Sequence, residues 1–481
     1  GTMNAAYAQD LVASANSANG TGGFIQAGGA ENLAHSDTID MATFTVTIDE
    51  DLDLGTNAMG AVTGTTGSLI MQSTDSSANT AKLTSFITSG AGNLSILGET
   101  GGSATFAVTS AGNVTTVGGT ITVTGDTNTA VATSLVILGV TVGGTGAEFV
   151  LDETASNGTA VLDLDAASAA QTLTGDVNGA AAGEGSLKLQ GGHATGNIIT
   201  GAVGNDFSLR LLDVDVVASF SSTVAAGIID LESSATFSGD VTATTVTSNT
   251  SGKVVLLNGD ITATTITIDT SSVDANKDVT SNVVLANAAG DLLISGAVDQ
   301  TLTGNITATD GEGSLIITNA AASGSFTATG TIGVTAARLL EVSMTDGSNA
   351  IFQSAISAET LDIDTNSAAE YIQVTAGNLI GDSSGTAAGA IEIAAGAVIR
   401  LDSAVVNGTT VFDLSKGNAT DAGFASAGAF TIIPSSSFVS GTVEFLEGGT
   451  LSNLLDDGGV DGAEVANHFT VQDNAIIDYT V

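Results

Sequence analysis

The chain has 481 residues, 43% of them hydrophobic, so it is able to bury a core. Eight Lys and Arg residues stand against 51 Asp and Glu residues, and the formal net charge of -43 excludes nucleic acids and anionic membrane surfaces as partners, because both would be repelled. The absence of Cys excludes disulfides and thiolate metal sites, while the lack of Trp, the 61 Gly and the single Pro are typical of a repetitive chain and not of a globular enzyme.

Residues 1–40 are interpreted as an N-terminal cap or assembly segment. Ala6-Tyr7-Ala8 has the small-x-small pattern that ends a signal peptide, which favours export, although an Ala-rich chain also produces this pattern by chance. Residues 5–15 (AAYAQDLVASA) predict either one short helix or a cap on a solenoid end. No apolar run reaches the length of a membrane span, so we expect no direct span.

Short segments with a period of two follow. Examples are TFTVTID at Thr43–Asp49, TITVTGD at Thr120–Asp126 and TITIDTS at Thr265–Ser271. Alternation of β-branched residues predicts strands that bury one face. Asn-Gly pairs such as Asn157-Gly158 and Asn258-Gly259 supply turns that tolerate a positive φ. These features predict an all-β protein.

Internal repeats occur at two scales. GDVTATTVT at Gly239–Thr247 recurs 20 residues later as GDITATTIT at Gly259–Thr267. QTLTGDVNGAAAGEGSLKL at Gln171–Leu189 recurs as QTLTGNITATDGEGSLII at Gln300–Ile317. Later matches continue this second repeat and are ATGxI at Ala194–Ile198 and Ala328–Ile332, and RLLDV at Arg210–Val214 with RLLEV at Arg338–Val342. The order of the matches predicts duplicated blocks near residues 171–232 and 300–365.

These repeats predict a parallel β-solenoid with coils of about 20 residues. Coils would stack about 4.8 Å apart over residues 41–428, and residues 429–481 would form C-terminal capping coils. Residues 233–299, between the two blocks, fit either ordinary coils or a distinct module. The alternative architecture is a row of β-sandwich domains, which would produce alternation without a 20-residue echo.

Acidic residues recur in D-x-D pairs on expected strands. Two acids at this spacing point outward while the apolar residue between them points inward. The pairs are Asp51/Asp53, Asp163/Asp165, Asp213/Asp215 and Asp362/Asp364. They are interpreted first as a solvated outer face and second as oxygen ligands for a hard cation such as calcium. The densest calcium candidates are Asp49, Glu50, Asp51, Asp53, Asp456, Asp457, Asp461 and Glu464.

The repeat style also resembles a known family. The TLTG…GEGSL segments, the coil at Gly259–Thr267 and the ending FTVQDNAIIDYTV at Phe469–Val481 resemble the passenger domains of autotransporter surface proteins, in particular cleaved rickettsial surface-layer antigens. The resemblance implies a right-handed β-solenoid on the outer cell envelope. It also implies that a segment like residues 429–481 lies next to a membrane barrel.

Catalytic motifs are missing from the sequence. The three His residues, His35, His193 and His468, lie far apart, and there is no HExxH, P-loop or nucleophile elbow. We therefore expect no enzyme. The sequence favours an extracellular, self-associating structural subunit of a cell-surface layer, bridged by calcium. The alternatives are an adhesin that binds a host or matrix ligand and, third, an exported polysaccharide-active solenoid.

Overall fold

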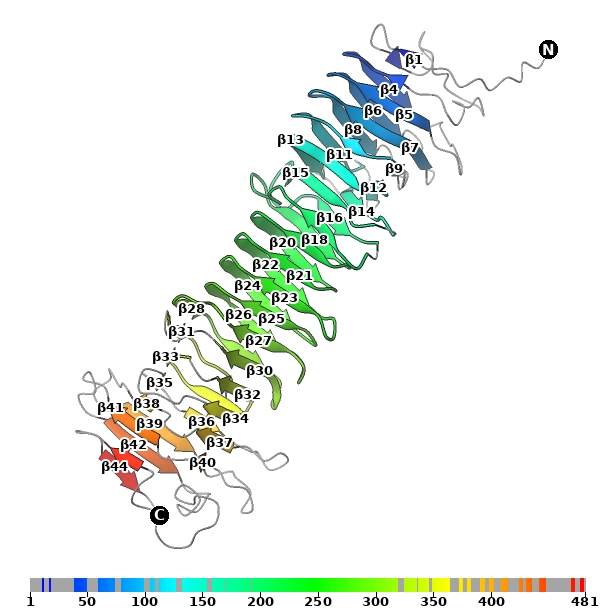
Figure 1. Ribbon diagram of the computed structural model, residues 1–481. Coiled ribbons are helices and arrows are strands. Elements are labelled where there is room, and N and C mark those ends of the chain that lie inside the picture. The colour runs from blue at the N-terminus through cyan, green and yellow to red at the C-terminus, as the bar shows by residue number, and fades with distance from the viewer. Residues whose placement is uncertain are drawn as a thin grey trace, which may run out of the picture. The chain divides into compact units, whose positions relative to one another are not determined.

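The computed structural model shows an all-β protein built from parallel strands (Figure 1). It describes residues 39–363 with gaps and, outside this range, only the backbone of short strands; the gaps are 50–58, 74–78, 99–103, 109–111, 127–131, 154–157, 168, 192, 319–323, 335 and 346–347. Side chains are described between Asp40 and Glu359, with wider gaps. The described residues contain no helix, hence none that could cross a membrane. Two compact units divide the chain at residues 1–244 and 245–481.

The strands of unit 1 are short and are separated by turns. They are β1 (Leu11–Val12), β2 (Ser17–Ala18), β3 (Ile39–Asp40), β4 (Thr45–Asp49), β5 (Met59–Gly64), β6 (Ser68–Ser73), β7 (Asn79–Thr88), β8 (Asn93–Gly98), β9 (Ala104–Val108), β10 (Val114–Thr115), β11 (Thr120–Thr124), β12 (Ala132–Ile137), β13 (Thr141–Asp152), β14 (Thr159–Leu164), β15 (Thr172–Gly179), β16 (Ser186–Leu189), β17 (Asn197–Ile199), β18 (Leu209–Val214), β19 (Ala218–Phe220), β20 (Val224–Leu231) and β21 (Ala235–Phe237). The division between the units falls within β22 (Val241–Ser248).

The strands of unit 2 follow the same pattern. They are β23 (Val254–Leu257), β24 (Ile261–Ile268), β25 (Ser272–Ala275), β26 (Val279–Leu285), β27 (Asp291–Ile294), β28 (Gln300–Thr303), β29 (Ile306–Ala308), β30 (Glu312–Ile317), β31 (Phe326–Ala328), β32 (Leu339–Met344), β33 (Ala350–Phe352), β34 (Ile356–Ile363), β35 (Ile372–Val374), β36 (Leu379–Gly381), β37 (Ala390–Ile393), β38 (Val398–Leu401), β39 (Gly408–Asp413), β40 (Phe424–Ser426), β41 (Phe430–Pro434), β42 (Gly441–Leu446), β43 (Phe469–Val471) and β44 (Ile476–Tyr479).

Three ladders of paired residues run through the core of unit 1, one residue per coil in each. Ladder A contains Val62, Phe86, Val114, Val142, Leu173, Ile199, Phe220 and Phe237. Ladder B contains Val46, Leu69, Leu94, Ile121, Phe149, Val177, Val203 and Val224. Ladder C contains Phe106, Leu135, Leu162, Leu187, Leu212 and Ile229. All of these side chains are buried, so each coil buries its apolar face only against its neighbours.

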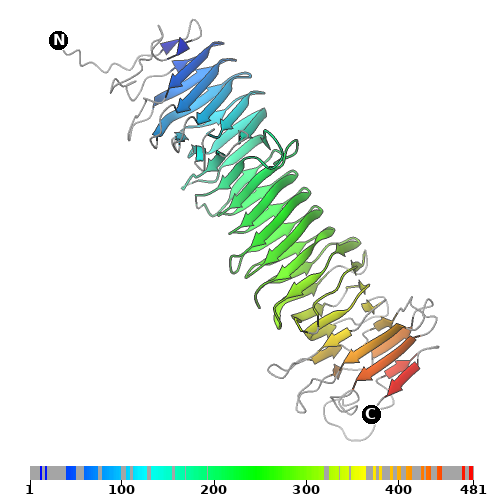
Figure 2. The ribbon, with the colours of Figure 1, turned by 180° about the vertical axis from the view of Figure 1, so that it is seen from behind.

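Unit 2 has three ladders of the same kind. They contain Val255, Val273, Leu292, Leu315 and Val342; Ile261, Val279, Leu302, Ala328 and Phe352; and Ile266, Val283, Ile306, Ile332 and Ile356. These side chains are also buried. Within each unit, the strands of successive coils lie side by side in both views (Figures 1 and 2). Residues 254–294 are thus ordinary coils and not a distinct module.

The pairing confirms the parallel β-solenoid and rules out the β-sandwich alternative. Every strand pair among the described residues whose register is known is parallel, whereas a sandwich is built from antiparallel strands. Leu11 and Val12, where a short helix was one of two expectations, form a strand that pairs with β3. Strands β41–β44, in the predicted C-terminal cap, also pair in parallel with earlier strands of unit 2.

The coil length varies, whereas the 20-residue repeat in the sequence predicts a constant value of about 20 residues. Between paired residues the advance is 23 from Val46 to Leu69, 28 from Ile121 to Phe149, 17 from Leu212 to Ile229, 18 from Val255 to Val273 and 27 from Leu315 to Val342. The strands keep their register while the turns between them change in length, because a turn at the surface accepts insertions at little cost.

The first duplicated block is anchored by a buried glutamine. Gln171 is fully buried, and its Nε2 donates to the carbonyls of Ile137 and Gly139 in the preceding coil at 2.7 and 2.8 Å. Its Oε1 accepts from the Ala166 N–H at 3.0 Å. One side chain thus satisfies three main-chain groups at a turn, where no strand partner is present to do so.

The second block repeats this anchor with Gln300. Its Nε2 donates to the carbonyls of Ala275 and Lys277 at 2.9 and 3.2 Å, and its Oε1 accepts from the Gly296 N–H at 2.8 Å. Gln300 is as buried as Gln171. The repeated QTLTG segments therefore have the same local structure, in which the glutamine makes the same three hydrogen bonds to the main chain.

The GEGSL segments of the two blocks also share a main-chain conformation. Gly185 and Gly313 have φ values of 80° and 68°, and a Cβ at either position would collide with the side chain of Leu151 or Leu285 in the preceding coil. Glycine is required at both positions because it combines a positive φ with the absence of a side chain. These turns bring the coils into close contact.

Two sequence matches of the duplication are wrong in the structure. RLLDV and RLLEV are out of register by two residues, because Leu187 pairs with Leu212 whereas its counterpart Leu315 pairs with Val342. The ATGxI alignment pairs Ile198 with Ile332, but Ile198 points outward whereas Ile332 is buried and bridges Ile306 and Ile356. The structural counterpart of Ile332 is Val203, which is buried and precedes Gly204, a glycine with positive φ like Gly333. The two ATGxI segments are therefore similar in composition but occupy different positions in their coils.

Candidate functional site

A double column of polar side chains covers the outer surface of ladder C in unit 1. Asp163, Lys188, Asp213 and Asp230 pair in register on β14, β16, β18 and β20. Asp165, Gln190, Asp215 and Glu232 follow two residues later in the same coils. We call these eight residues the acidic ladder. Because neighbouring strands lie about 4.8 Å apart, its six carboxylates are close to one another, with one Lys among them.

One of the six carboxylates, that of Asp213, forms an ion pair, and another, that of Asp215, accepts a hydrogen bond from a neutral side chain. Lys188 Nζ donates to Asp213 Oδ2 at 3.0 Å, and Gln190 Nε2 donates to Asp215 Oδ2 at 3.0 Å. The Oδ1 atoms of Asp163 and Asp230 are buried and have no hydrogen-bond partner in the described part of the chain. A buried acceptor without a donor is costly, so the ionised ladder is under electrostatic strain.

The electrostatic strain raises the pKa of four carboxyl groups of the ladder. Burial, with the charge of Asp165 as the next cause, raises the pKa of Asp163 from 3.8 to about 6, although Lys188 opposes this change. Burial and the charge of Asp213 raise the pKa of Asp215 and of Asp230. The charge of Asp215 is the main cause that raises the pKa of Glu232. These four carboxyl groups therefore gain protons more readily than isolated carboxyl groups do.

The D-x-D prediction is confirmed where it can be examined. Leu164 and Val214, the central residues of two pairs, are fully buried, and their flanking acids point outward. The stacking of these pairs over Lys188 and Asp230 was not foreseen, because the sequence alone does not show which residues of different coils share a register. The Asp-Leu-Glu run at residues 230–232 carried the same alternation and was the signal that was missed.

The calcium candidates lie outside the described side chains. Asp49 ends β4, whose backbone is described, while the other candidates, Glu50, Asp51, Asp53, Asp456, Asp457, Asp461 and Glu464, fall on residues that the structure does not describe. Among the residues whose side chains are described, no group of three or more His, Asp or Glu has the geometry to hold a metal ion.

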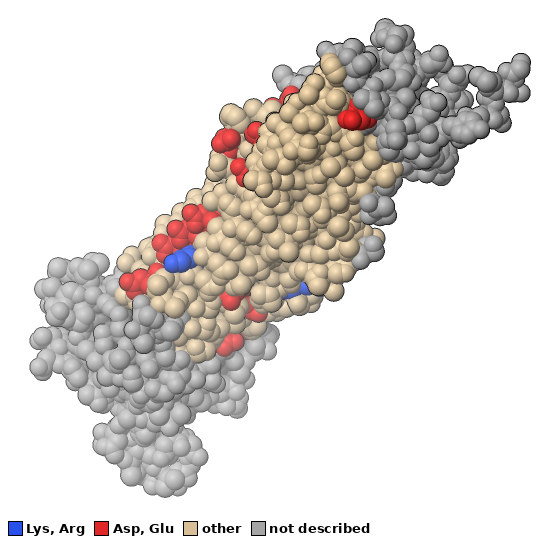
Figure 3. Space-filling view, turned by 45° about the horizontal axis from the view of Figure 1, so that its top comes forward, with Lys and Arg blue, Asp and Glu red and all other residues tan. Residues whose placement is uncertain are grey.

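The outer surface of ladder A has the opposite character. One outward column pairs in register and contains Thr141, Thr172, Ile198, Ser219 and Thr236. A second outward column, on the earlier coils, contains Thr63, Ile87 and Thr115. None of these residues carries a charge; Asp40, which pairs with Thr63 from the preceding coil, is the carboxylate next to them. Figure 3 shows one side of the described part, where uncharged residues cover broad areas and carboxylates gather in a few groups.

Exposed aliphatic side chains concentrate at ladder A. Ile87 and Ile198, each 40% exposed, belong to its outer surface. Val117 and Val140, 52% and 41% exposed, occupy the turns that follow β10 and precede β13, the strands of this ladder. The other large hydrophobic residues of unit 1 that the structure describes as exposed are Phe207 and Ile228, away from ladder A.

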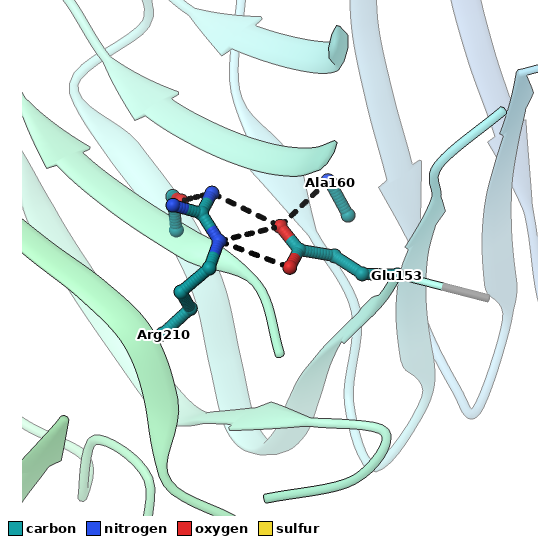
Figure 4. A network of polar contacts seen from close by, with 4 residues as sticks. Glu153, Ala160 and Arg210 are labelled. Atoms are coloured by element: carbon teal, nitrogen blue, oxygen red, sulfur yellow. Dashed lines mark hydrogen bonds and ion pairs between the residues drawn. The ribbon is translucent and has the colours of Figure 1, made fainter. Parts of the chain in front are cut away.

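A separate polar cluster joins three coils of unit 1 (Figure 4). Arg210 donates from Nε to both carboxylate oxygens of Glu153 at 3.0 and 3.2 Å, and from Nη2 to Glu153 Oε1 and Ser186 Oγ at 3.1 and 2.6 Å. Glu153 Oε1 also accepts from the Ala160 N–H at 3.2 Å. All acceptors are within the solenoid, so we interpret the cluster as structural.

The second block places its arginine differently. Arg338 is completely buried and donates to Asp310 from Nε at 2.8 Å and from Nη2 at 3.0 Å. Nη2 also donates to Glu359 Oε1 at 3.1 Å. The two carboxylates come from the coils before and after Arg338, so the guanidinium joins three successive coils of unit 2.

Comparison with known proteins provides no further assignment, since no protein-family model, curated protein or solved structure matches this chain.

Proposed function

We propose that this protein is an extracellular structural subunit of a cell-surface layer or a similar self-assembling surface structure. The observation that carries the proposal is the separation of charge on unit 1: six carboxylates follow ladder C, while the two outward columns of ladder A have none between Thr63 and Thr236. A stack of coils with a continuous apolar core supplies a regular surface on which such a separation extends over many coils. The resemblance of its repeats to autotransporter passenger domains supports the same assignment.

The net charge sets a condition on any such assembly. At -43, copies of this chain repel one another, and the repulsion weakens when salt screens it or when cations bridge carboxylates. Calcium suits carboxylate oxygens, so we include calcium bridging in the proposal. The acidic ladder and the acids at residues 49–53 and 456–464 are the groups it would use.

Negative-stain electron microscopy of the purified protein tests this proposal. Samples with millimolar calcium should contain ordered sheets or filaments, and a chelator should dissolve them. Magnesium at equal concentration is the control for general screening. Isolated molecules under all conditions would contradict the assembly proposal.

An adhesin is the second candidate, and the exposed apolar residues favour it. Phe207 is 48% exposed in the turn between β17 and β18, where an aromatic side chain is suited to anchor a receptor. Saturable binding of isolated molecules to host cells or matrix components, reduced by Phe207→Ala, would favour the adhesin over the layer.

A further inference from the structure

We propose that two copies of this chain meet through the outer surface of ladder A of unit 1, face to face. The inference rests on the proposed function, because it assigns a contact surface to the self-assembly. The surface comprises the two outward columns described above, with Val117 and Val140 in its bordering turns.

Charge decides which surface a second copy can approach. A copy that covered the acidic ladder would remove water from its carboxylates, of which Asp163 and Asp230 each have a buried Oδ1 atom without a hydrogen-bond partner, and would require bridging cations to offset the repulsion. Desolvating unpaired charges is costly, whereas covering threonine and isoleucine is not. With 51 acidic residues in the chain, an uncharged strip along eight coils is a place where two copies repel each other weakly.

The same argument identifies the partner face. If ladder A of one copy packed on the acidic ladder of another, the carboxylates would again lose water without compensation. Ladder A against ladder A avoids this cost for both copies. The contact is then isologous, with a two-fold axis, which is the commonest symmetry of soluble homodimers.

The side chains of this surface are suited to rigid packing. Threonine and isoleucine are branched at Cβ and are restricted in χ1, so a contact immobilises little additional freedom. Thr172, Ile198 and Ser219 are held in register by main-chain pairing, which makes the surface regular along the stack. Each threonine offers a methyl group for packing and a hydroxyl for hydrogen bonds.

The size of the surface predicts a weak contact. Eight coils at about 4.8 Å span roughly 34 Å, and two outward columns with their side chains are about 10 Å wide. This strip, roughly 350 Å² in projection, is well below the about 800 Å² per partner of a stable complex. We therefore expect a contact that forms at high local concentration, as in a layer, and dissociates in dilute solution.

Crosslinking of single-cysteine variants tests the contact directly, because the chain has no Cys of its own. Thr172→Cys lies near the middle of ladder A and meets its counterpart if the two-fold axis is perpendicular to the stack. Ser219→Cys lies toward one end and meets its counterpart if the axis runs along the stack. Ser95→Cys and Ser134→Cys, outward on ladders B and C, are matched controls. A short bismaleimide should give dimers with at least one of the first two variants and with neither control.

A charge variant provides the second test. Ile198→Glu, in the background of the variant that crosslinks, should lower the dimer yield about tenfold, because two carboxylates would face each other. Phe207→Glu adds the same charge at a residue of similar exposure outside ladder A and should leave the yield unchanged. Thermal unfolding of both variants verifies that unit 1 is folded.

The outcomes separate this inference from the proposed function. Ordered arrays by electron microscopy with no ladder A crosslinks, or with arrays of Ile198→Glu unchanged, would overturn the contact surface and leave the layer standing. Ladder A dimers without arrays under any condition would support the contact and contradict the layer. Equal crosslinking at ladders A, B and C would also overturn the inference, since it would indicate random collision.

Discussion

The two duplicated blocks share their main-chain framework, but their arginines occupy different positions in it. Arg210 follows the buried Leu209, whereas Arg338 precedes Leu339, the structural counterpart of Leu209. Gln171 and Gln300 make the same three hydrogen bonds to turns. Arg210 keeps 38% of its side chain exposed and has one acidic partner, whereas Arg338 is fully buried between Asp310 and Glu359. The duplication thus retained the contacts that close the coils, while the ion pairs diverged.

The outer surfaces of the blocks differ as well. In the first block, Asp213 stacks between Lys188 and Asp230 within the acidic ladder. The residue at the same position of the second block, Ser343, pairs with Ile316 and Asp362. Inward positions must fit the apolar core of every coil, but outward positions are free to change. A solenoid can therefore carry different surface chemistry on one repeated framework.

The largest predicted effect is the loss of the buried arginine. Arg338→Met keeps the side-chain length but leaves Asp310 and Glu359 without their cation. We expect a loss of about 3 kcal/mol, the lower end for breaking a buried ion pair, because Asp310 stays 39% exposed to water. Urea unfolding monitored by hydrogen exchange of unit 2 measures the change.

Arg338→Lys serves as the control for this prediction. It retains the charge but cannot reach both carboxylates with the bidentate geometry of a guanidinium, so an intermediate loss is expected. Stability of Arg338→Met equal to that of the unaltered protein would show that the buried cluster contributes no net stability.

The glutamine anchors should have equal effects in the two blocks. Gln171→Ala and Gln300→Ala each leave one N–H and two carbonyl groups unsatisfied within the solenoid. We expect each change to cost about 2 kcal/mol. Unfolding of the two single variants, each followed in its own unit, measures this. A twofold or larger difference between them would contradict the view that the blocks share one framework.

The stability of unit 1 should depend on pH through the acidic ladder. Because the folded-state pKa of Asp163 is raised to about 6 from 3.8, the folded state binds this proton more tightly than the unfolded state. The resulting stabilisation is complete below about pH 4 and is lost as pH rises through 6. Asp165, Lys188, Asp213 and Asp215 are the charged groups that act on this carboxyl.

Asp163→Asn tests this dependence by removing the charge. At pH 7 the variant should be more stable by about 1 to 2 kcal/mol, after allowance for solvent screening, and at pH 4 the difference should vanish. Unfolding at both pH values provides the measurement. A variant less stable than the unaltered protein at pH 7 would refute the strain in the ladder. In unit 2, Asp291→Asn is the comparison, because burial raises the pKa of that carboxyl while hydrogen bonds from Ser272 and Ser314 oppose the rise.

The smallest effect is expected at the exposed arginine. Arg210→Met removes the contacts to Glu153 and Ser186, but water can solvate the groups left behind. We expect a loss of about 1 kcal/mol or less, in the range of exposed ion pairs. The loss should shrink further in 0.5 to 1 M salt, roughly, since screening weakens exposed pairs. An effect as large as that of Arg338→Met would abolish the distinction between the two clusters.

The sequence by itself determined the class of fold, the duplication and the direction of the D-x-D side chains. The alternation of polar and apolar residues along a strand is a local property of the sequence. Leu164 and Val214 could therefore be placed in the core from their neighbours alone. The repeated QTLTG and GEGSL segments predicted that the two blocks contain equivalent turns. Gln171 and Gln300, which begin the QTLTG segments, make equivalent contacts.

Only the tertiary structure decided which residues of different coils meet. The number of residues between paired positions of successive coils varies from 17 to 39, and the local pattern does not show it. The stacking of Asp163 on Lys188 and Asp213 could therefore not be read from spacing. The burial of Arg338 between acids of the coils before and after it has the same origin. Contacts between coils depend on the lengths of the turns, and surface turns vary because their length costs little free energy.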